Sequence, residues 1–270
     1  MEKFQKLFPK LPCVIGMIHL RALPGTPKYN AGSWQRVIDS ALHEAETYTR
    51  AGVDGILVEN MNDVPFTNRF AGPEITASMT RICSDVKSIA SGIPCGVQIL
   101  AGCNKEALAV AAASRLDFIR AEAFIFSHVA DEGLMHGDAA ELLRYRKQID
   151  ADNILVFTDV KKKHCSHSIT ADVGLGETCK AAEFFLSDGV IVTGTATGAS
   201  ASCVDLDEAR EACSLPVLIG SGVTADNVGD YKLASGLIVG STFKEGGYWE
   251  NKICEGKLNS FMDVVRDLRR

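Results

Sequence analysis

Short apolar runs alternate with amphipathic stretches along the whole chain, and this alternation limits the fold more than any other feature. The apolar runs have the length of buried strands and are too short for helices. They lie at residues 13–19, 54–59, 94–100, 118–121, 154–159, 189–193, 216–219 and 236–239. The stretches between them favour helices near residues 34–51, 74–90, 105–114, 139–148, 170–186, 205–213, 225–233 and 258–268.

Eight strand–helix units joined by right-handed crossovers produce a parallel sheet, and eight parallel strands are enough to close a barrel. The sequence therefore predicts a single α/β domain over residues 1–270, a (β/α)8 TIM barrel. An open doubly wound sheet is the alternative. It is the weaker one, because the first strand carries no glycine fingerprint and the glycine-rich turns come last.

Composition narrows the classes of function. The 270 residues are 46% hydrophobic, yet no apolar run approaches the roughly 18 residues of a membrane span. A net charge of −6 and a pI near 5.6 argue against nucleic acid as a partner. The N-terminus lacks the apolar core of a secretion signal and the pattern of a transit peptide. We therefore expect a cytoplasmic protein or one of another reducing compartment; a removed presequence and a homo-oligomer both stay open.

The cysteines and histidines indicate no metal centre. The nine cysteines are odd in number and include no Cys-x-x-Cys pair, which is typical of free thiols. The densest metal-like cluster, residues 164–167, has no second cluster at ligand spacing. A P-loop and a nucleophile elbow are also missing, so we expect neither a metal nor a cofactor.

Two glycine-rich turns follow the last two expected strands. Gly220-Ser221-Gly222 comes after residues 216–219, with Thr224 as the expected N-cap of the next helix, and Gly240-Ser241 comes after residues 236–239. Glycines allow backbone N–H groups to approach a ligand, and this is where (β/α)8 enzymes usually hold a phosphate. Ordinary strand-to-helix turns are the alternative.

Polar residues gather where the expected strands end, which is where (β/α)8 barrels carry their chemistry. These residues are His19, Glu59, Asn60, Gln98, Arg120, Glu122, Asp159, Lys161 and Thr193. Such a density of polar groups at one end of apolar strands is unusual for a core and favours a binding site.

Glu59, Asp159, Lys161 and His19 are the catalytic candidates. Glu59 and Asp159 end the second and fifth strands, so they should face each other across the mouth and serve as acid and base. Alternatively, each forms an ion pair with Arg120 or Lys161. Lys161 could bind a ligand anion, belong to a solvated basic loop, or act as a Schiff-base nucleophile, in that order of preference. His19 is either a proton donor or a polar strand end.

The ligand-binding candidates surround these four residues. They are Asn60, Gln98, Arg120, Glu122, Thr193, Gly194, Gly220, Ser221, Gly222, Gly240 and Ser241. Gln98 either orients a ligand or satisfies the inner network of the barrel. The row of small residues at 193–198 is expected to line the floor of the site.

Several of these motifs together resemble the BtpA/SgcQ family. They are His19 after GMI, VENMNDVPF at 58–66, DVKKKH at 159–164, TGTATG at 193–198 and IGSGVTADNV at 219–228. The resemblance covers nearly the whole chain and implies a (β/α)8 barrel of the ribulose-phosphate-binding type, similar to phosphoribosylanthranilate isomerase-like barrels. The basic segment 161–163 departs from the family pattern.

The resemblance implies a ligand class without a settled reaction. It is a phosphorylated sugar or a phosphoribosyl-type small molecule, on which the protein would act as an isomerase or lyase through carboxylate acid–base chemistry. The family takes its name from a cyanobacterial factor needed for photosystem I accumulation. The alternative is therefore a non-catalytic binding or assembly factor that keeps the barrel.

Overall fold

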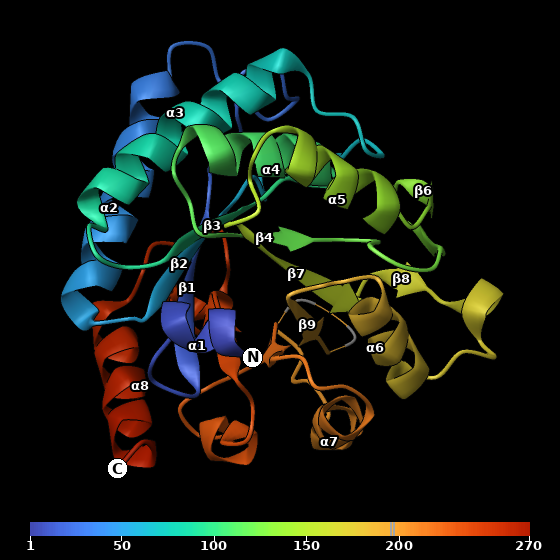
Figure 1. The fold of residues 1–270 in the computed structure, drawn as a ribbon. Coiled ribbons are helices and arrows are strands. Elements are labelled where there is room, and N and C mark those ends of the chain that lie inside the picture. Colours follow the sequence, from blue (N-terminus) through green and yellow to red (C-terminus); the bar gives the residue numbers. More distant parts are fainter. Residues whose placement is uncertain (195, 197) are drawn as a thin grey trace.

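The computed structural model describes residues 1–194, 196 and 198–270. Eight parallel strands close into a barrel in the order β1-β11-β10-β9-β7-β4-β3-β2, which confirms the predicted fold class (Figure 1). The strands are β1 Cys13–His19, β2 Gly55–Glu59, β3 Cys95–Gln98, β4 Phe118–Ala121, β7 Leu155–Val160, β9 Gly189–Val192, β10 Val217–Ile219 and β11 Gly236–Val239. The ends of all eight strands differ by no more than two residues from the ends of the apolar runs that predict them.

The helices surround the barrel as expected, with one exception (Figure 1). They are α2 Trp34–Ala51, α3 Pro73–Ile89, α4 Asn104–Ala113, α5 Ala139–Gln148, α6 Leu175–Phe184, α7 Cys203–Ala212 and α8 Glu255–Leu268. The helix predicted at 225–233 is wrong: only a short 3-10 turn, Val228–Tyr231, forms there. The Asn227 side chain accepts the N–H of Thr224 at 2.7 Å, a local turn that competes with helix formation.

A short N-terminal helix that the sequence pattern did not indicate, α1 Glu2–Leu7, closes one end of the barrel. Its Phe4 ring lies 5.6 Å from the Phe157 ring, and Phe8 just after it lies 5.9 Å from Phe118. These aromatic rings fill the end where the strands begin. Because that end is packed, a ligand has access to the interior only from the carboxyl ends of the strands.

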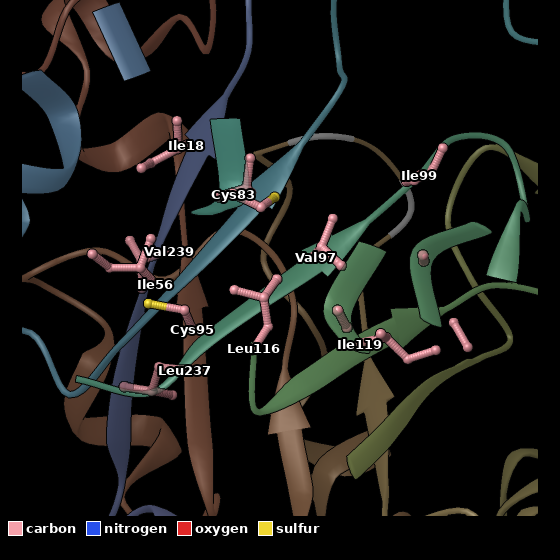
Figure 2. Packing of buried hydrophobic residues seen from close by; sticks show 14 of the residues in the cluster. Ile18, Ile56, Cys83, Cys95, Val97, Ile99, Leu116, Ile119, Leu237 and Val239 are labelled. Atoms are coloured by element: carbon pink, nitrogen blue, oxygen red, sulfur yellow. The ribbon is translucent and has the colours of Figure 1, made fainter. Parts of the chain in front are cut away.

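Side chains alternate between the inside of the barrel and the layer beneath the helices. Figure 2 shows members of the outer layer, such as Ile18, Ile56, Val97 and Ile119. The inner layer holds the residues of opposite parity, among them Met17, Leu57, Phe118 and Phe157. Two residues further along each strand, the same inward parity falls on the polar residues at the strand ends.

A small antiparallel sheet beside the mouth was also not predicted. It combines β5 His128–Ala130, β6 Gly133–Met135 and β8 Cys165–Ser166 in the order β6-β5-β8. The loops after β4 and β7 supply these strands, so two segments distant in sequence pair above the barrel. Buried Met135 packs against Ala101 and Ala123 and joins this sheet to the loops after β3 and β4.

Two further expectations concern the whole chain. In the part of the chain that the structure describes, no helix has both the length and the apolar character needed to cross a bilayer. All nine cysteines are free thiols in the structure, and five of them are buried.

Candidate active site

A cavity of about 140 Å³ opens at the carboxyl ends of the barrel strands. One inward-facing position on each strand, or just after it, contributes to a single layer at this end of the barrel. These eight positions are His19, Glu59, Gln98, Arg120, Asp159, Thr193, Gly220 and Gly240. Six of them carry polar side chains, and the other two are glycines against which neighbouring side chains pack closely: a Cβ on Gly220 would lie 2.6 Å from Ile191 Cγ2.

Strand register brings the polar members of this layer together. His19 pairs with Glu59 across β1 and β2, and Glu59 pairs with Gln98 across β2 and β3. All three side chains line the cavity and are largely buried. Gln98 is 2% exposed, and its Oε1 atom has no hydrogen-bond donor among the described residues. The arrangement therefore leaves a buried acceptor for a ligand.

Arg120 and Asp159 form a buried bidentate ion pair. The guanidinium donates from Nε to Oδ2 at 2.8 Å and from Nη2 to Oδ1 at 2.7 Å. This geometry uses both carboxylate oxygens, so Asp159 lies in the site as the counter-ion of Arg120. The predicted neighbourhood of Glu59, Asp159 and Arg120 is present, with the two carboxylates in different environments.

Among the described residues, Glu59 has no bidentate partner of this kind. Burial raises its pKa from 4.5 to about 7, while the positive charges of Arg120 and Lys163 hold the rise in check. His19 Nε2 lies 3.7 Å from Glu59 Oε2. Burial, together with the charges of Lys244, Lys163 and Arg120, lowers the pKa of His19 to about 3, so its imidazole is neutral at neutral pH. Glu59 is thus a carboxyl group that can hold or release a proton near pH 7.

The three consecutive lysines 161–163 have three different environments. Lys161 does not line the cavity, and its Nζ donates to the carbonyl of Thr170 at 3.0 Å. Its position beside the carboxylates is therefore a wrong prediction. β7 ends at Val160, and Lys161 adopts a left-handed φ of 48°, which interrupts the inward–outward alternation. Lys162 and Lys163 line the cavity instead.

Lys162 and Lys163 differ in their pairing. Lys162 Nζ binds Glu122 Oε1 at 2.8 Å, and Glu122 also accepts the N–H of Gly102 at 2.9 Å. Lys163 forms no ion pair within 4.0 Å in the described part of the chain, although its backbone N–H donates to Thr193 Oγ1 at 3.0 Å. The repeated lysines gave no signal that could have distinguished these roles.

Three predicted ligand-binding residues support the loops and do not line the cavity. Asn60 has the outward parity; its side chain accepts the N–H of Leu100 at 2.8 Å and donates to Asp63 at 2.9 Å. The Thr193 hydroxyl is occupied by Lys163, and the N–H of Gly194 donates to Ser221 Oγ at 2.8 Å. Within the row 193–198, Gly198 lines the cavity, and residues 195 and 197 lie outside the described residues.

The two glycine turns lie at the opposite side of the cavity. Gly222 has a φ of +69°, and a Cβ atom there would lie 2.3 Å from the backbone nitrogen of Ser200. A Cβ on Gly240 would lie 2.6 Å from His19 Cε1. The N–H groups of Gly222, Ser241 and Thr242 donate to no acceptor within the described residues. Unpaired N–H groups converging on one cavity can bind an anion.

The Ser221 side chain is not available to a ligand. Its hydroxyl donates to the carbonyl of Ala199 at 2.9 Å and accepts the N–H of Gly194. Apolar residues that the sequence did not single out complete the wall; they are Met17, Met61, Phe66, Leu100, Ala101, Val223, Ile238 and Val239. A polar base with apolar walls is the usual composition of a small-molecule site.

The closed (β/α)8 barrel is a fold that this chain shares with solved enzyme structures of low sequence identity. Orotidine 5'-monophosphate decarboxylase from Methanocaldococcus jannaschii superimposes with a TM-score of 0.60 over 95% of this chain and 99% of that one, at 13% identity. The likeness at this identity concerns the fold. The chain belongs to the BtpA family, whose sequence profile matches residues 10–267.

Relatives in the family come from distant organisms. A mitochondrial protein of Caenorhabditis elegans is 49% identical and covers 96% of this chain and 95% of its own length. The photosystem I biogenesis protein BtpA of Synechocystis is 34% identical and covers 99% of this chain and 92% of its own length. The resemblance inferred from the sequence motifs is thereby confirmed.

Proposed function

We propose that this barrel is an enzyme that binds a phosphorylated sugar or phosphoribosyl-type small molecule and acts on it as an isomerase or lyase. The observation that carries the proposal is that Glu59, a buried carboxyl group with a pKa of about 7, lines the same cavity as three residues whose backbone N–H groups have no acceptor among the described residues. One feature suits proton transfer at neutral pH, and the other suits an anion.

The phosphate is assigned to the turns after β10 and β11. The N–H groups of Gly222, Ser241 and Thr242 point to this role, because these residues line the cavity and their N–H groups donate to no acceptor within the described residues. A ligand held there extends across the cavity toward β2, β4 and β7. Its other end then meets Glu59, Lys163 and the Arg120–Asp159 pair.

Glu59 is the proposed acid–base group. A carboxyl with a pKa of about 7 is present in both protonation states at neutral pH, so it can remove a proton from carbon and return it. Arg120, fixed by Asp159, supplies positive charge for an oxyanion that forms during the reaction. In this account Asp159 is a positioning residue, and neutral His19 offers a hydrogen bond to a ligand hydroxyl through Nδ1, which has no partner among the described residues.

The comparisons bear on the alternative function. The cyanobacterial relative is a photosystem I biogenesis protein, which favours a binding or assembly factor. However, the nematode protein is more similar to this chain, and animals have no photosystem. Any role common to both relatives is therefore independent of photosynthesis, and a small-molecule reaction meets that condition. A reducing compartment, either the cytosol or the mitochondrial matrix, is our proposed location.

Two steps test the proposed function. Mass spectrometry of the small molecules released from the purified, denatured protein should identify a phosphorylated compound. With that compound or its reaction partner as substrate, Glu59→Gln should lower turnover by about 10²–10⁴-fold. Glu46→Gln, on the exposed side of α2, is the matched control and should leave turnover unchanged. Equal turnover in both variants would refute the role of Glu59.

A further inference from the structure

Lys163 is a cation of the cavity that forms no ion pair with any described residue. Arg120 is paired with Asp159, and Lys162 is paired with Glu122, both at hydrogen-bond distance. In the described part of the chain no carboxylate lies within 4.0 Å of Lys163 Nζ, and the amine forms no hydrogen bond. A half-buried lysine that is left unpaired in this way favours an anionic or carbonyl partner from outside the protein.

The position of Lys163 assigns it to the reacting end of the ligand. It follows β7, whereas the glycine turns follow β10 and β11, with β9 between them in the barrel. The charges that act on its amine are those of Arg120, Glu59, Asp159 and Lys162. Burial first, and then the like charge of Arg120, lower the pKa of Lys163 to about 8. A substantial fraction of the amine is therefore uncharged, and hence nucleophilic, near neutral pH.

We propose that Lys163 forms a Schiff base with the carbonyl carbon of a phosphorylated aldehyde or ketone. This inference rests on the proposed function and narrows its substrate class to phosphorylated carbonyl compounds. The sequence pattern indicated Lys161 as the lysine of the site and did not single out Lys163. In the structure the Lys161 amine donates to the carbonyl of Thr170 outside the cavity.

The groups around Lys163 supply the proton transfers that such a step needs. The uncharged amine attacks the carbonyl carbon, a C–N bond forms, and the carbonyl oxygen takes a proton from Glu59. The nitrogen gives up one proton to the Glu59 carboxylate so formed, which yields a neutral carbinolamine. Glu59 then protonates the hydroxyl group, which leaves as water while the nitrogen lone pair forms the C=N bond. No oxidant or reductant is involved.

Gln98 offers a hydrogen-bond acceptor for the carbinolamine intermediate. Gln98 lines the cavity, and its Oε1 atom is buried and lacks a donor among the described residues. The carbinolamine hydroxyl is a donor that this acceptor could bind. Neighbouring Glu59 pairs with Gln98 in strand register, so the acceptor and the proton donor lie side by side.

Trapping with a small aldehyde tests the inference in the intact wild-type protein. Glyceraldehyde 3-phosphate is added at about pH 7.5 with sodium cyanoborohydride, which reduces an imine to a stable secondary amine. Peptide mapping then gives the labelling rate at each lysine. An amine with a pKa of about 8 has on the order of 100-fold more free base at this pH than an ordinary lysine in water. We expect Lys163 to be labelled at least about tenfold faster than exposed Lys10.

The controls separate this inference from the proposed function. Unphosphorylated glyceraldehyde should label Lys163 more slowly, and inorganic phosphate should protect Lys163 from the phosphorylated probe. Equal labelling by both probes, without protection, would support the imine and contradict the phosphate site. Labelling of Lys163 no faster than Lys10, while phosphate and the probe still bind, would overturn the inference and leave the proposed function standing. Lys163→Arg should lose the fast adduct at an unchanged melting temperature; the mapping in wild-type protein decides the matter if this variant fails to fold.

Discussion

Replacing Glu59 with glutamine should stabilise the folded protein at neutral pH while removing its proposed acid–base group. The folded state raises the pKa of this carboxyl from 4.5 to about 7. Between these two values the folded protein binds more protons than the unfolded chain, so the free energy of unfolding falls as pH rises. Glutamine has nearly the same shape as glutamate and carries no charge that burial would desolvate. The variant should therefore not show this fall in the free energy of unfolding.

The magnitude follows from the size of the shift. Each pKa unit corresponds to about 1.4 kcal/mol, so the wild-type protein loses about 3 kcal/mol at pH 7 relative to a chain that stays neutral at this position. The loss shrinks to about 1 kcal/mol at pH 5 and vanishes toward pH 4. The advantage of Glu59→Gln should therefore grow as the pH is raised from 4 to 7 and then level off.

Denaturant unfolding at a series of pH values measures this difference directly. The wild-type protein, Glu59→Gln and the control Glu46→Gln are unfolded side by side in urea, and the free energies are compared at each pH. Comparing variants cancels the titration of groups that all three proteins share. A Glu59→Gln protein that is less stable than wild type at pH 7, or a difference that does not change with pH, would refute the reasoning about Glu59.

Three further outcomes follow from the structure. Asp159→Asn should lower the free energy of unfolding by about 3–5 kcal/mol, because it leaves buried Arg120 without its charge partner, whereas exposed Asp131→Asn should have little effect in the same urea titration. Gly222→Ala should cost more than about 1 kcal/mol and weaken calorimetric binding of inorganic phosphate, while Gly229→Ala, where a Cβ meets nothing within 4 Å, should change neither. Ellman's reagent should modify exposed Cys203 first and buried Cys83 only after unfolding, because burial holds the pKa of the Cys83 thiol well above its ordinary value. Rapid modification of Cys83 in the native protein would contradict the packing described above.

The barrel could be predicted from the sequence because its signal is repeated and local. Each apolar run has the length of a strand, and six of the eight strand ends carry a polar residue at the inward parity, as His19, Glu59 and Gln98 do. Once the strands are placed, parallel register alone brings these residues to one end. The glycine turns were found for the same reason, since Gly220 and Gly240 occupy equivalent positions on adjacent strands.

The parts that could not be predicted depend on contacts between distant segments. The sheet β6-β5-β8 forms only when the loops after β4 and β7 meet, and no periodicity within either loop signals that pairing. The prediction that Lys161 lies in the site was wrong for a related reason. A single left-handed residue, Lys161, interrupts the alternation after β7, so that Lys162 and Lys163 line the cavity and Lys161 does not. Backbone conformations of this kind are set by tertiary packing.

A crystal structure of the protein with ribose 5-phosphate tests the central claim most directly. The account predicts that the phosphate accepts hydrogen bonds from the N–H groups of Gly222, Ser241 and Thr242, and that the sugar extends toward Glu59 and Lys163. A phosphate bound elsewhere, with these N–H groups hydrogen-bonded only to water, would contradict the account. So would a sugar that lies away from Glu59 when the phosphate occupies the turns.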